Sequence, residues 1–94
     1  MSSASIEHRR RVYIRNSQGM HARPAAEFVK CAKHFEAEIW VRKAETEVNG
    51  KSIMGLMMLA AERGSELEIR AAGSDAVDAV DELVRLVETG FGEA

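Results

Sequence analysis

The sequence predicts an α+β fold in which a four-stranded antiparallel sheet is covered on one face by three helices. Three short stretches alternate apolar and polar residues with a period of two, which is typical of strands that bury one face, and a short fourth strand is expected between two turn signals. Three other stretches carry apolar residues at helical spacing. Because every strand keeps one polar face, we expect an antiparallel sheet that is open on that side. The expected architecture is a two-layer open-faced β-sandwich with the order β-α-β-β-α-β-α.

The expected strands cover residues 11–15, 37–42, 46–49 and 66–71. Val12 and Ile14 illustrate the pattern in the first strand, because their neighbours are arginine or tyrosine. An Asn-Gly pair at residues 49–50 marks the end of the third strand. Residues 1–8 are expected to form a loose lead-in, and residues 91–94 a short tail.

The expected helices cover residues 22–33, residues 53–62 and a stretch between residues 75 and 90. Pro24 fits the first turn of the first helix, because the N–H that proline lacks would have no intrahelical partner there. This start places His21 at the N-cap position. Ser52 heads the second helix, since its hydroxyl can accept a hydrogen bond from a first-turn N–H. The apolar stripe of the third helix is expected to consist of Val77, Val80, Val84 and Val87.

Length and composition limit the classes of function. A chain of 94 residues predicts one domain, residues 1–94, whose modest core leaves any chemistry near the surface. The formal net charge of -2 gives no reason to bind nucleic acid, and no apolar run is long enough for membrane insertion. The single cysteine, Cys31, excludes an internal disulfide and a multi-thiolate metal site. We therefore expect a cytoplasmic monomer that uses no metal or cofactor.

The segment Gly-Met-His-Ala-Arg-Pro-Ala at residues 19–25 has the properties that a phosphoryl-accepting site needs. Imidazole, here that of His21, is a nucleophile whose neutral form is available near physiological pH. The following helix start would offer the N–H groups of Ala22 and Arg23 to a phosphate, and the Arg23 guanidinium adds a fixed cation. Taken alone, however, a histidine at a helix start is more often a plain cap or surface residue.

A second segment, Lys-Ser-Ile-Met-Gly at residues 51–55, again places a hydroxyl at a helix start. A phosphate on Ser52 would be stabilised by first-turn N–H groups without melting the helix. A serine that merely caps the helix is the commoner explanation of such a pattern.

The helix after Ser52 is too apolar for a single buried stripe. Leu56 and Leu59 can fill the core together with either Ile53 or Met58. The remaining methionines, Met54 and Met57, would then be exposed. Flexible methionine side chains suit a surface that binds several partners, while the alternative is a core helix with surplus apolar residues.

Together, the two segments resemble the signatures of the HPr family, the histidine-containing phosphocarriers of the bacterial phosphoenolpyruvate phosphotransferase system, which includes the nitrogen-branch NPr proteins. Residues 19–25 match the active-site signature and residues 51–55 match the regulatory-serine signature, at the family's spacing between His21 and Ser52. Relatives without the histidine, such as Crh, are disfavoured because His21 is present. The choice between sugar transport and a regulatory branch stays open.

The resemblance implies that His21 accepts a phosphoryl group on Nδ1 from Enzyme I and passes it to Enzyme IIA proteins. The chain would then be a covalent phosphohistidine carrier and not a conventional enzyme. Arg23 would stabilise the phosphate, and Ser52 would be the regulatory target of HPr kinase/phosphorylase. The docking surface for these partners would consist of hydrophobic residues, namely Met20, Ile53, Met54 and Met57.

Outside this family, the main alternative is a non-catalytic regulatory α/β interaction module. An RNA-binding sheet would need stacking aromatics on its open face, and the expected strands offer only Tyr13 and Trp40. A metal carrier would need paired cysteines. A hydrolase would need a second acid or base beside His21, which the local sequence does not supply, although a distant residue could fold close.

Overall fold

The structure of the protein is a computed structural model that describes residues 6–93. Its strands are β1 (Glu7–Tyr13), β2 (Glu38–Lys43), β3 (Thr46–Asn49) and β4 (Glu66–Ala72). Its helices are α1 (Ala22–Ala32), α2 (Ile53–Met58), α3 (Ala76–Glu88) and the short 3₁₀ turn η1 (Gly90–Gly92). The element order agrees with the expected pattern, and η1 is added at its end.

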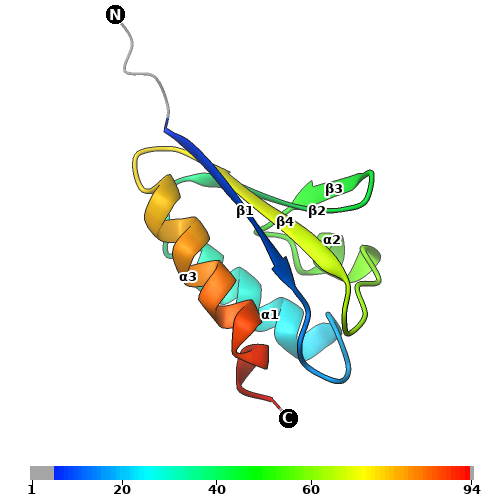
Figure 1. Ribbon diagram of the computed structural model, residues 1–94. Helices are drawn as coiled ribbons and strands as arrows, with labels where there is room; N and C mark the ends of the chain where they lie inside the picture. The colour runs from blue at the N-terminus through cyan, green and yellow to red at the C-terminus, as the bar shows by residue number, and fades with distance from the viewer. Residues whose placement is uncertain (1–5, 94) are drawn as a thin grey trace, which may run out of the picture.

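The four strands form one antiparallel sheet with the order β1-β4-β2-β3. Apolar positions are in register across the sheet, because Val12 lies opposite Leu67, and Val41 lies opposite both Ile69 and Val48. Helices α1 and α3 run side by side along one face of the sheet, and α2 packs against α1 (Figure 1). The predicted α+β open-faced sandwich is therefore confirmed.

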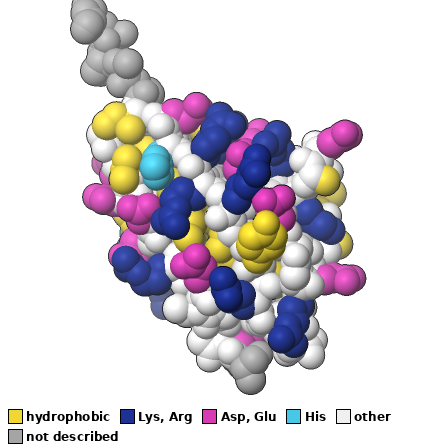
Figure 2. All heavy atoms as spheres, in the orientation of Figure 1, with side chains coloured by type: hydrophobic (Ala, Val, Ile, Leu, Met, Phe, Trp, Pro, Cys, Tyr) yellow, Lys and Arg dark blue, Asp and Glu magenta, His cyan; other side chains and the backbone are white. Residues whose placement is uncertain are grey.

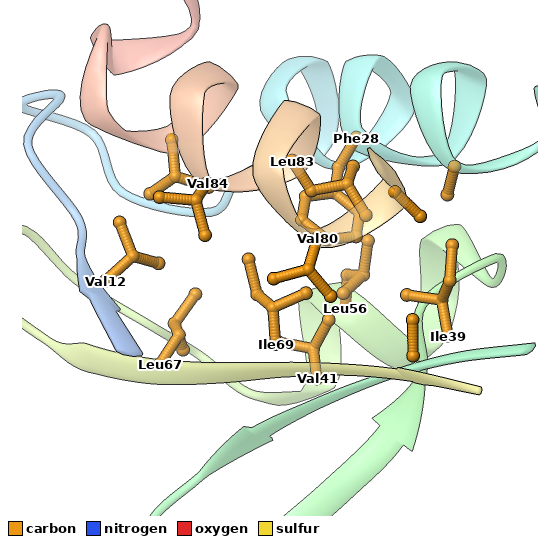
Figure 3. Close-up of a cluster of buried hydrophobic side chains, with 14 of the residues drawn as sticks. Val12, Phe28, Ile39, Val41, Leu56, Leu67, Ile69, Val80, Leu83 and Val84 are labelled. Atoms are coloured by element: carbon orange, nitrogen blue, oxygen red, sulfur yellow. The ribbon is translucent and has the colours of Figure 1, made fainter. Parts of the chain in front are cut away.

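The core lies between this sheet and the helices. Figure 3 shows Phe28 from α1, Leu83 from α3 and Leu56 from α2 around the sheet residues Val41 and Ile69. All five side chains are 0% exposed. Because burial of such a side chain is worth about 1.5–3 kcal/mol, the core fixes which face of each helix meets the sheet. It thereby fixes where the starts of α1 and α2 lie on the surface.

Strand β1 starts earlier than the apolar alternation predicts and pairs with β4 along its whole length. The expectation of a loose lead-in over residues 1–8 is therefore wrong at its last two positions, while residues 1–5 lie outside the described part of the chain. The start of β1 shows no alternation of apolar and polar residues, because the residues that face inward here are His8 and Arg10. Their side chains lie 3.9 and 3.3 Å from the Asp81 carboxylate on α3, so polar contacts replace apolar packing.

Helix α2 is shorter than predicted, since it ends at Met58 instead of near residue 62. Ala60 adopts a φ of 51°, which is incompatible with continuing a right-handed helix. The Lys43 ammonium donates to the carbonyl oxygens of Leu59 and Ala60, both at 3.3 Å. A cation from the β2–β3 hairpin thus satisfies carbonyls at the helix end.

Helix α3 buries a stripe that contains alanines as well as valines: Ala76, Ala79, Val80, Leu83, Val84 and Val87. Val77 was expected in this stripe but is 42% exposed, because the stripe is centred on Ala76, Leu83 and Val87, and Val77 lies to one side of it. The Asp75 carboxylate before the helix accepts the N–H groups of Glu36 and Ala37, each at 2.9 Å. These bonds hold the pKa of Asp75 below its usual range.

The open face of the sheet is covered by ion pairs. The Arg70 guanidinium lies 4.0 Å from the centre of the Trp40 ring and contacts the carboxylates of Glu7 at 2.9 Å and Glu47 at 3.3 Å. Acidic and basic side chains are also interspersed over the face seen in Figure 2. Trp40 therefore lies beneath a paired arginine, unlike the free aromatic platform of an RNA-binding sheet.

Candidate functional site

His21 occupies the N-cap of α1, as the position of Pro24 predicts. Its backbone is extended, with φ -83° and ψ -169°, and its side chain makes no capping hydrogen bond. The His21 carbonyl accepts the first intrahelical bond, from the N–H of Ala25 at 3.0 Å. The N–H groups of Ala22 and Arg23 precede that bond, and Pro24 has none. The ring, 41% exposed, thus stands beside free donors at the positive end of a helix.

The loop before His21 is fixed to the segment that follows α2. The N–H of Met20 donates to the Ala61 carbonyl at 2.8 Å. Gly19 has a φ of +69°, and a Cβ at this position would lie 2.4 Å from the same carbonyl oxygen. Only glycine fits both the backbone conformation and this close approach. The position of His21 relative to α2 is therefore set by the backbone.

Met20, which was expected on the docking surface, is largely buried in this structure. Its side chain is only 4% exposed and packs into the core beneath the loop. Met20 still lines the hollow that His21 and Met57 share, so its contact with partners stays a prediction. Its N–H bond to Ala61 turns the side chain inward, and the neighbouring His21 then points outward.

A residue that the sequence reasoning missed lies against the His21 ring. Glu93 Oε1 is 3.4 Å from His21 Nε2, and the same oxygen accepts Asn16 Nδ2 at 3.2 Å. Asn16 is 1% exposed and also donates to the Gly19 carbonyl at 2.8 Å. Residues 91–93 are therefore not the simple tail that was expected, because Phe91 packs against the core.

Arg23 is exposed on the first turn of α1. No ion pair or side-chain hydrogen bond engages its guanidinium within the described range, residues 6–93. The side chain can therefore turn toward an anion at His21 without first breaking a contact. This freedom fits the predicted role of Arg23 as a partner of phosphate, which stays a prediction.

Ser52 is the N-cap of α2, as predicted, and its Oγ accepts the N–H of Gly55 at 3.0 Å. The residue is partly exposed. The neighbouring Lys51 ammonium reaches across to the Phe35 carbonyl at 2.7 Å and ties this helix start to the end of α1. Ser52 therefore has a structural role in the unmodified protein, and its hydroxyl also lies near the surface.

An exposed apolar surface follows Ser52 and is called the methionine patch. It consists of Ile53 (41% exposed), Met54 (74%), Met57 (43%) and Met58 (75%). The expected exposure of Met54 and Met57 is correct. The expectation that Ile53 or Met58 helps fill the core is wrong, since the short helix buries only Leu56 and leaves Leu59 to the following turn.

The methionine patch adjoins His21. Met57 and His21 line one shallow hollow together with Met20, Ala60 and Glu62. A macromolecule that covers the His21 ring therefore also meets apolar side chains of α2. The candidate site therefore includes an apolar surface suitable for protein binding as well as the His21 ring.

Cys31 takes no part in this site. It is half-buried on α1, where burial and the nearby Glu82 carboxylate raise the pKa of its thiol. Such a thiol is a poor nucleophile at neutral pH. Within residues 6–93 there is no cluster of side chains suited to hold a metal ion, and no helix long and apolar enough to cross a membrane.

An exposed imidazole at a helix start, with a free arginine and an apolar patch beside it, is suited to a protein that carries a small anionic group between partner proteins. The family model described as "PTS HPr component phosphorylation site" matches residues 8–89. The chain therefore belongs to the HPr family of the phosphotransferase system, and the identification made from the two motifs is confirmed. Proteins of this family are phosphohistidine carriers, and membership implies Enzyme I and Enzyme IIA proteins as partners.

Relatives with both family names support the assignment. The phosphocarrier protein HPr of Neisseria meningitidis serogroup A is 45% identical over 82 residues, which covers 87% of this chain and 92% of the relative. The phosphocarrier protein NPr of Proteus mirabilis is 39% identical over 85 residues, covering 89% and 94%. The crystal structure of HPr-C-His from Thermoanaerobacter tengcongensis gives a TM-score of 0.89 at 44% identity, covering 93% of this chain and 98% of that one.

Proposed function

We propose that His21 is the residue that accepts the phosphoryl group from Enzyme I and passes it to Enzyme IIA proteins. The observation that carries the proposal is the position of His21 inside the matched phosphorylation-site region, at a helix start, with its ring 41% exposed. An exposed ring can meet the donor and the acceptor protein in turn. Neutral imidazole supplies the nucleophilic nitrogen.

Arg23 and the first turn of α1 are proposed to hold the phosphoryl group once it is on His21. The N–H groups of Ala22 and Arg23 can donate to phosphate oxygens, and the helix end favours negative charge. The free guanidinium of Arg23 would add a charge-assisted hydrogen bond. These groups would stabilise the phosphorylated state without enclosing it, so a second protein can still reach the phosphorus.

The test is phosphorylation by Enzyme I in the presence of phosphoenolpyruvate, followed by mass spectrometry of the intact chain. We expect one acid-labile phosphoryl group on the wild type and none on His21→Ala. The matched control is His34→Ala, which removes a histidine from the turn after α1. An equal modification of His21→Ala and the wild type would refute the proposal, as would the absence of any modification.

The methionine patch is proposed to be the docking surface for Enzyme I and Enzyme IIA proteins. Its exposure beside His21 is unusual for apolar side chains in water and supports a binding role. Unbranched, polarisable methionine side chains can fit several partner surfaces. One patch could therefore serve both the donor and the acceptors of the phosphoryl group.

Ser52 is proposed to be a regulatory phosphorylation site for HPr kinase/phosphorylase. The support is its motif at residues 51–55 and its partial exposure next to the methionine patch. A phosphate there would place negative charge at the edge of the docking surface. It should slow phosphorylation of His21, and more strongly at low salt, because counterions screen the added charge.

The regulatory role is tested by incubating the chain with ATP and HPr kinase. We expect a stable phosphate on the wild type and none on Ser52→Ala. The control is Ser65→Ala, because Ser65 Oγ also accepts a backbone N–H, that of Glu62 at 2.9 Å. If Ser52→Ala is labelled as well as the wild type, the proposed regulation is wrong.

The working unit is proposed to be a cytoplasmic monomer. The site supports this stoichiometry, because His21, its helix start and the methionine patch all come from one chain. Sedimentation at equilibrium measures the mass directly. A stable dimer would contradict the proposal.

A further inference from the structure

We infer that Glu93 is a positioning residue for His21: the Glu93 carboxylate accepts a hydrogen bond from the Nε2–H of the imidazole, and Nδ1 is left as the nucleophilic nitrogen. The inference rests on the proposed role of His21 as the phosphoryl acceptor. Glu93 Oε1 lies 3.4 Å from His21 Nε2, a contact between the start of α1 and the segment after η1. The ring nitrogen that faces the carboxylate carries the proton, so the lone pair belongs to the other nitrogen.

The carboxylate is held in place by a buried side chain. Asn16 is 1% exposed, and its Nδ2 donates both to Glu93 Oε1 at 3.2 Å and to the Gly19 carbonyl at 2.8 Å. The Gly19 carbonyl also accepts the N–H of His21 at 3.0 Å. One buried amide therefore connects the Glu93 carboxylate and the loop that presents the histidine.

The backbone of the segment is also fixed. Phe91 packs against the core at a φ of 57°, a left-handed conformation that costs about 1–2 kcal/mol for a residue with a Cβ. The N–H of Glu93 donates to the Gly90 carbonyl at 2.8 Å. The Glu93 side chain is 16% exposed, compared with 41% for His21. The strained turn at Phe91 thus directs the Glu93 carboxylate inward, toward the His21 ring.

The chemical consequence follows from the charge on the ring. The Nδ1 lone pair forms the N–P bond while the bond from phosphorus to the donor's leaving atom breaks, and that electron pair stays with the donor. The proton remains on Nε2, so the imidazole becomes cationic as the phosphoryl group arrives. The Glu93 carboxylate faces this positive charge and stabilises it, as a carboxylate does beside the histidine of a catalytic triad.

The first readout is the tautomer of His21, measured by ¹⁵N chemical shifts in the full chain above the pH at which the ring is protonated. We expect the Nε2–H form to dominate in the wild type and the Nδ1–H fraction to rise in Glu93→Ala. Glu93→Gln keeps an acceptor oxygen without the charge, so its tautomer ratio should lie between the two. Glu88→Gln, which removes an exposed carboxylate from the end of α3, should match the wild type.

The second readout is the kinetics of phosphorylation by Enzyme I. We expect the turnover of Glu93→Ala to fall roughly tenfold, the scale of losing a carboxylate that orients a functional histidine. The KM for this protein should not change, because Glu93 lies outside the methionine patch. Unchanged tautomer and turnover in Glu93→Ala would overturn the inference, and so would a change in KM alone. Failure of Enzyme I to label even the wild type would instead refute the role of His21, while the tautomer measurement would still test the contact.

Discussion

His21 and Met57 line the same hollow, although one stands at the start of α1 and the other in the last turn of α2. The bond from the Met20 N–H to the Ala61 carbonyl, 2.8 Å long, holds these two segments together. A protein that reaches the His21 ring therefore contacts Met57 as well. The backbone therefore holds the proposed phosphoryl acceptor in a fixed position beside the proposed docking surface.

Truncation of Met57 should weaken partner binding without harming the chemistry. We expect Met57→Ala to raise the KM for phosphorylation by Enzyme I about fivefold, since loss of a side chain at the centre of an interface costs about 1 kcal/mol or more. Turnover at saturation should stay near the wild-type value. Steady-state kinetics at several concentrations of this protein separate the two parameters.

The control for that measurement is Val77→Ala. Val77 is 42% exposed on α3, close to the 43% of Met57, so both substitutions truncate an apolar side chain of similar fractional exposure. We expect no change in KM for Val77→Ala. If both variants raise KM equally, the methionine patch has no special role in docking.

Substitution of Gly19 should be much more damaging than the same change at Gly64. Both residues have positive φ, +69° and +89°, so alanine pays for a left-handed backbone at either site, about 1–2 kcal/mol. At Gly19 the new Cβ would also lie 2.4 Å from the Ala61 carbonyl oxygen, while nothing lies within 4 Å at Gly64. We expect Gly19→Ala to lose about 3 kcal/mol or more of unfolding free energy in urea. Similar losses for the two variants would show that the backbone near Ala61 yields easily.

The fold and the main site residues could be predicted because their signals are local. Alternation with a period of two marks the strands, and Pro24 in a first turn places His21 at an N-cap. The capping role of Ser52 also follows from its residue type and position, and the bond to the Gly55 N–H confirms it. Each of these inferences needs only neighbouring residues in the chain.

The contact between Glu93 and His21 could not be predicted in this way. It depends on a left-handed Phe91, an unfavourable conformation that no residue preference suggests, and on a buried Asn16 that joins the two ends of the domain. The buried state of Met20 was missed for a similar reason. Its orientation is set by a hydrogen bond to Ala61, which only the packing of α2 brings close.

The β2–β3 hairpin offers a stabilising substitution. Ala44 is exposed in the turn with a φ of 54°, where glycine carries no Cβ penalty. We expect Ala44→Gly to raise the unfolding free energy by about 1 kcal/mol. Ala26→Gly, an exposed position inside α1, should have the opposite sign and lose about 1 kcal/mol, because glycine is a poor helix former. Thermal or urea unfolding of the two variants gives the sign of each change in unfolding free energy. A loss of stability in Ala44→Gly would show that the left-handed conformation of Ala44 carries no cost that glycine relieves.

Asp75 should make stability depend on pH in acid. Its pKa is lowered chiefly by the N–H of Glu36, with the N–H of Ala37 and the charge of Lys51 adding to the effect. A carboxyl whose pKa is lower in the folded state contributes stability above its unfolded pKa. That contribution is lost as the pH falls below about 4 and through the folded pKa.

Asp75→Asn tests this linkage, because the amide keeps an acceptor oxygen but cannot ionise. We expect the wild type to be more stable than Asp75→Asn at pH 7, and the difference in unfolding free energy to shrink toward pH 2. Asp78→Asn is the matched control, since Asp78 is an exposed aspartate in the first turn of the same helix. A difference between the wild type and Asp75→Asn that stays constant from pH 7 to pH 2 would show that the Asp75 bonds matter for their geometry and not for their charge.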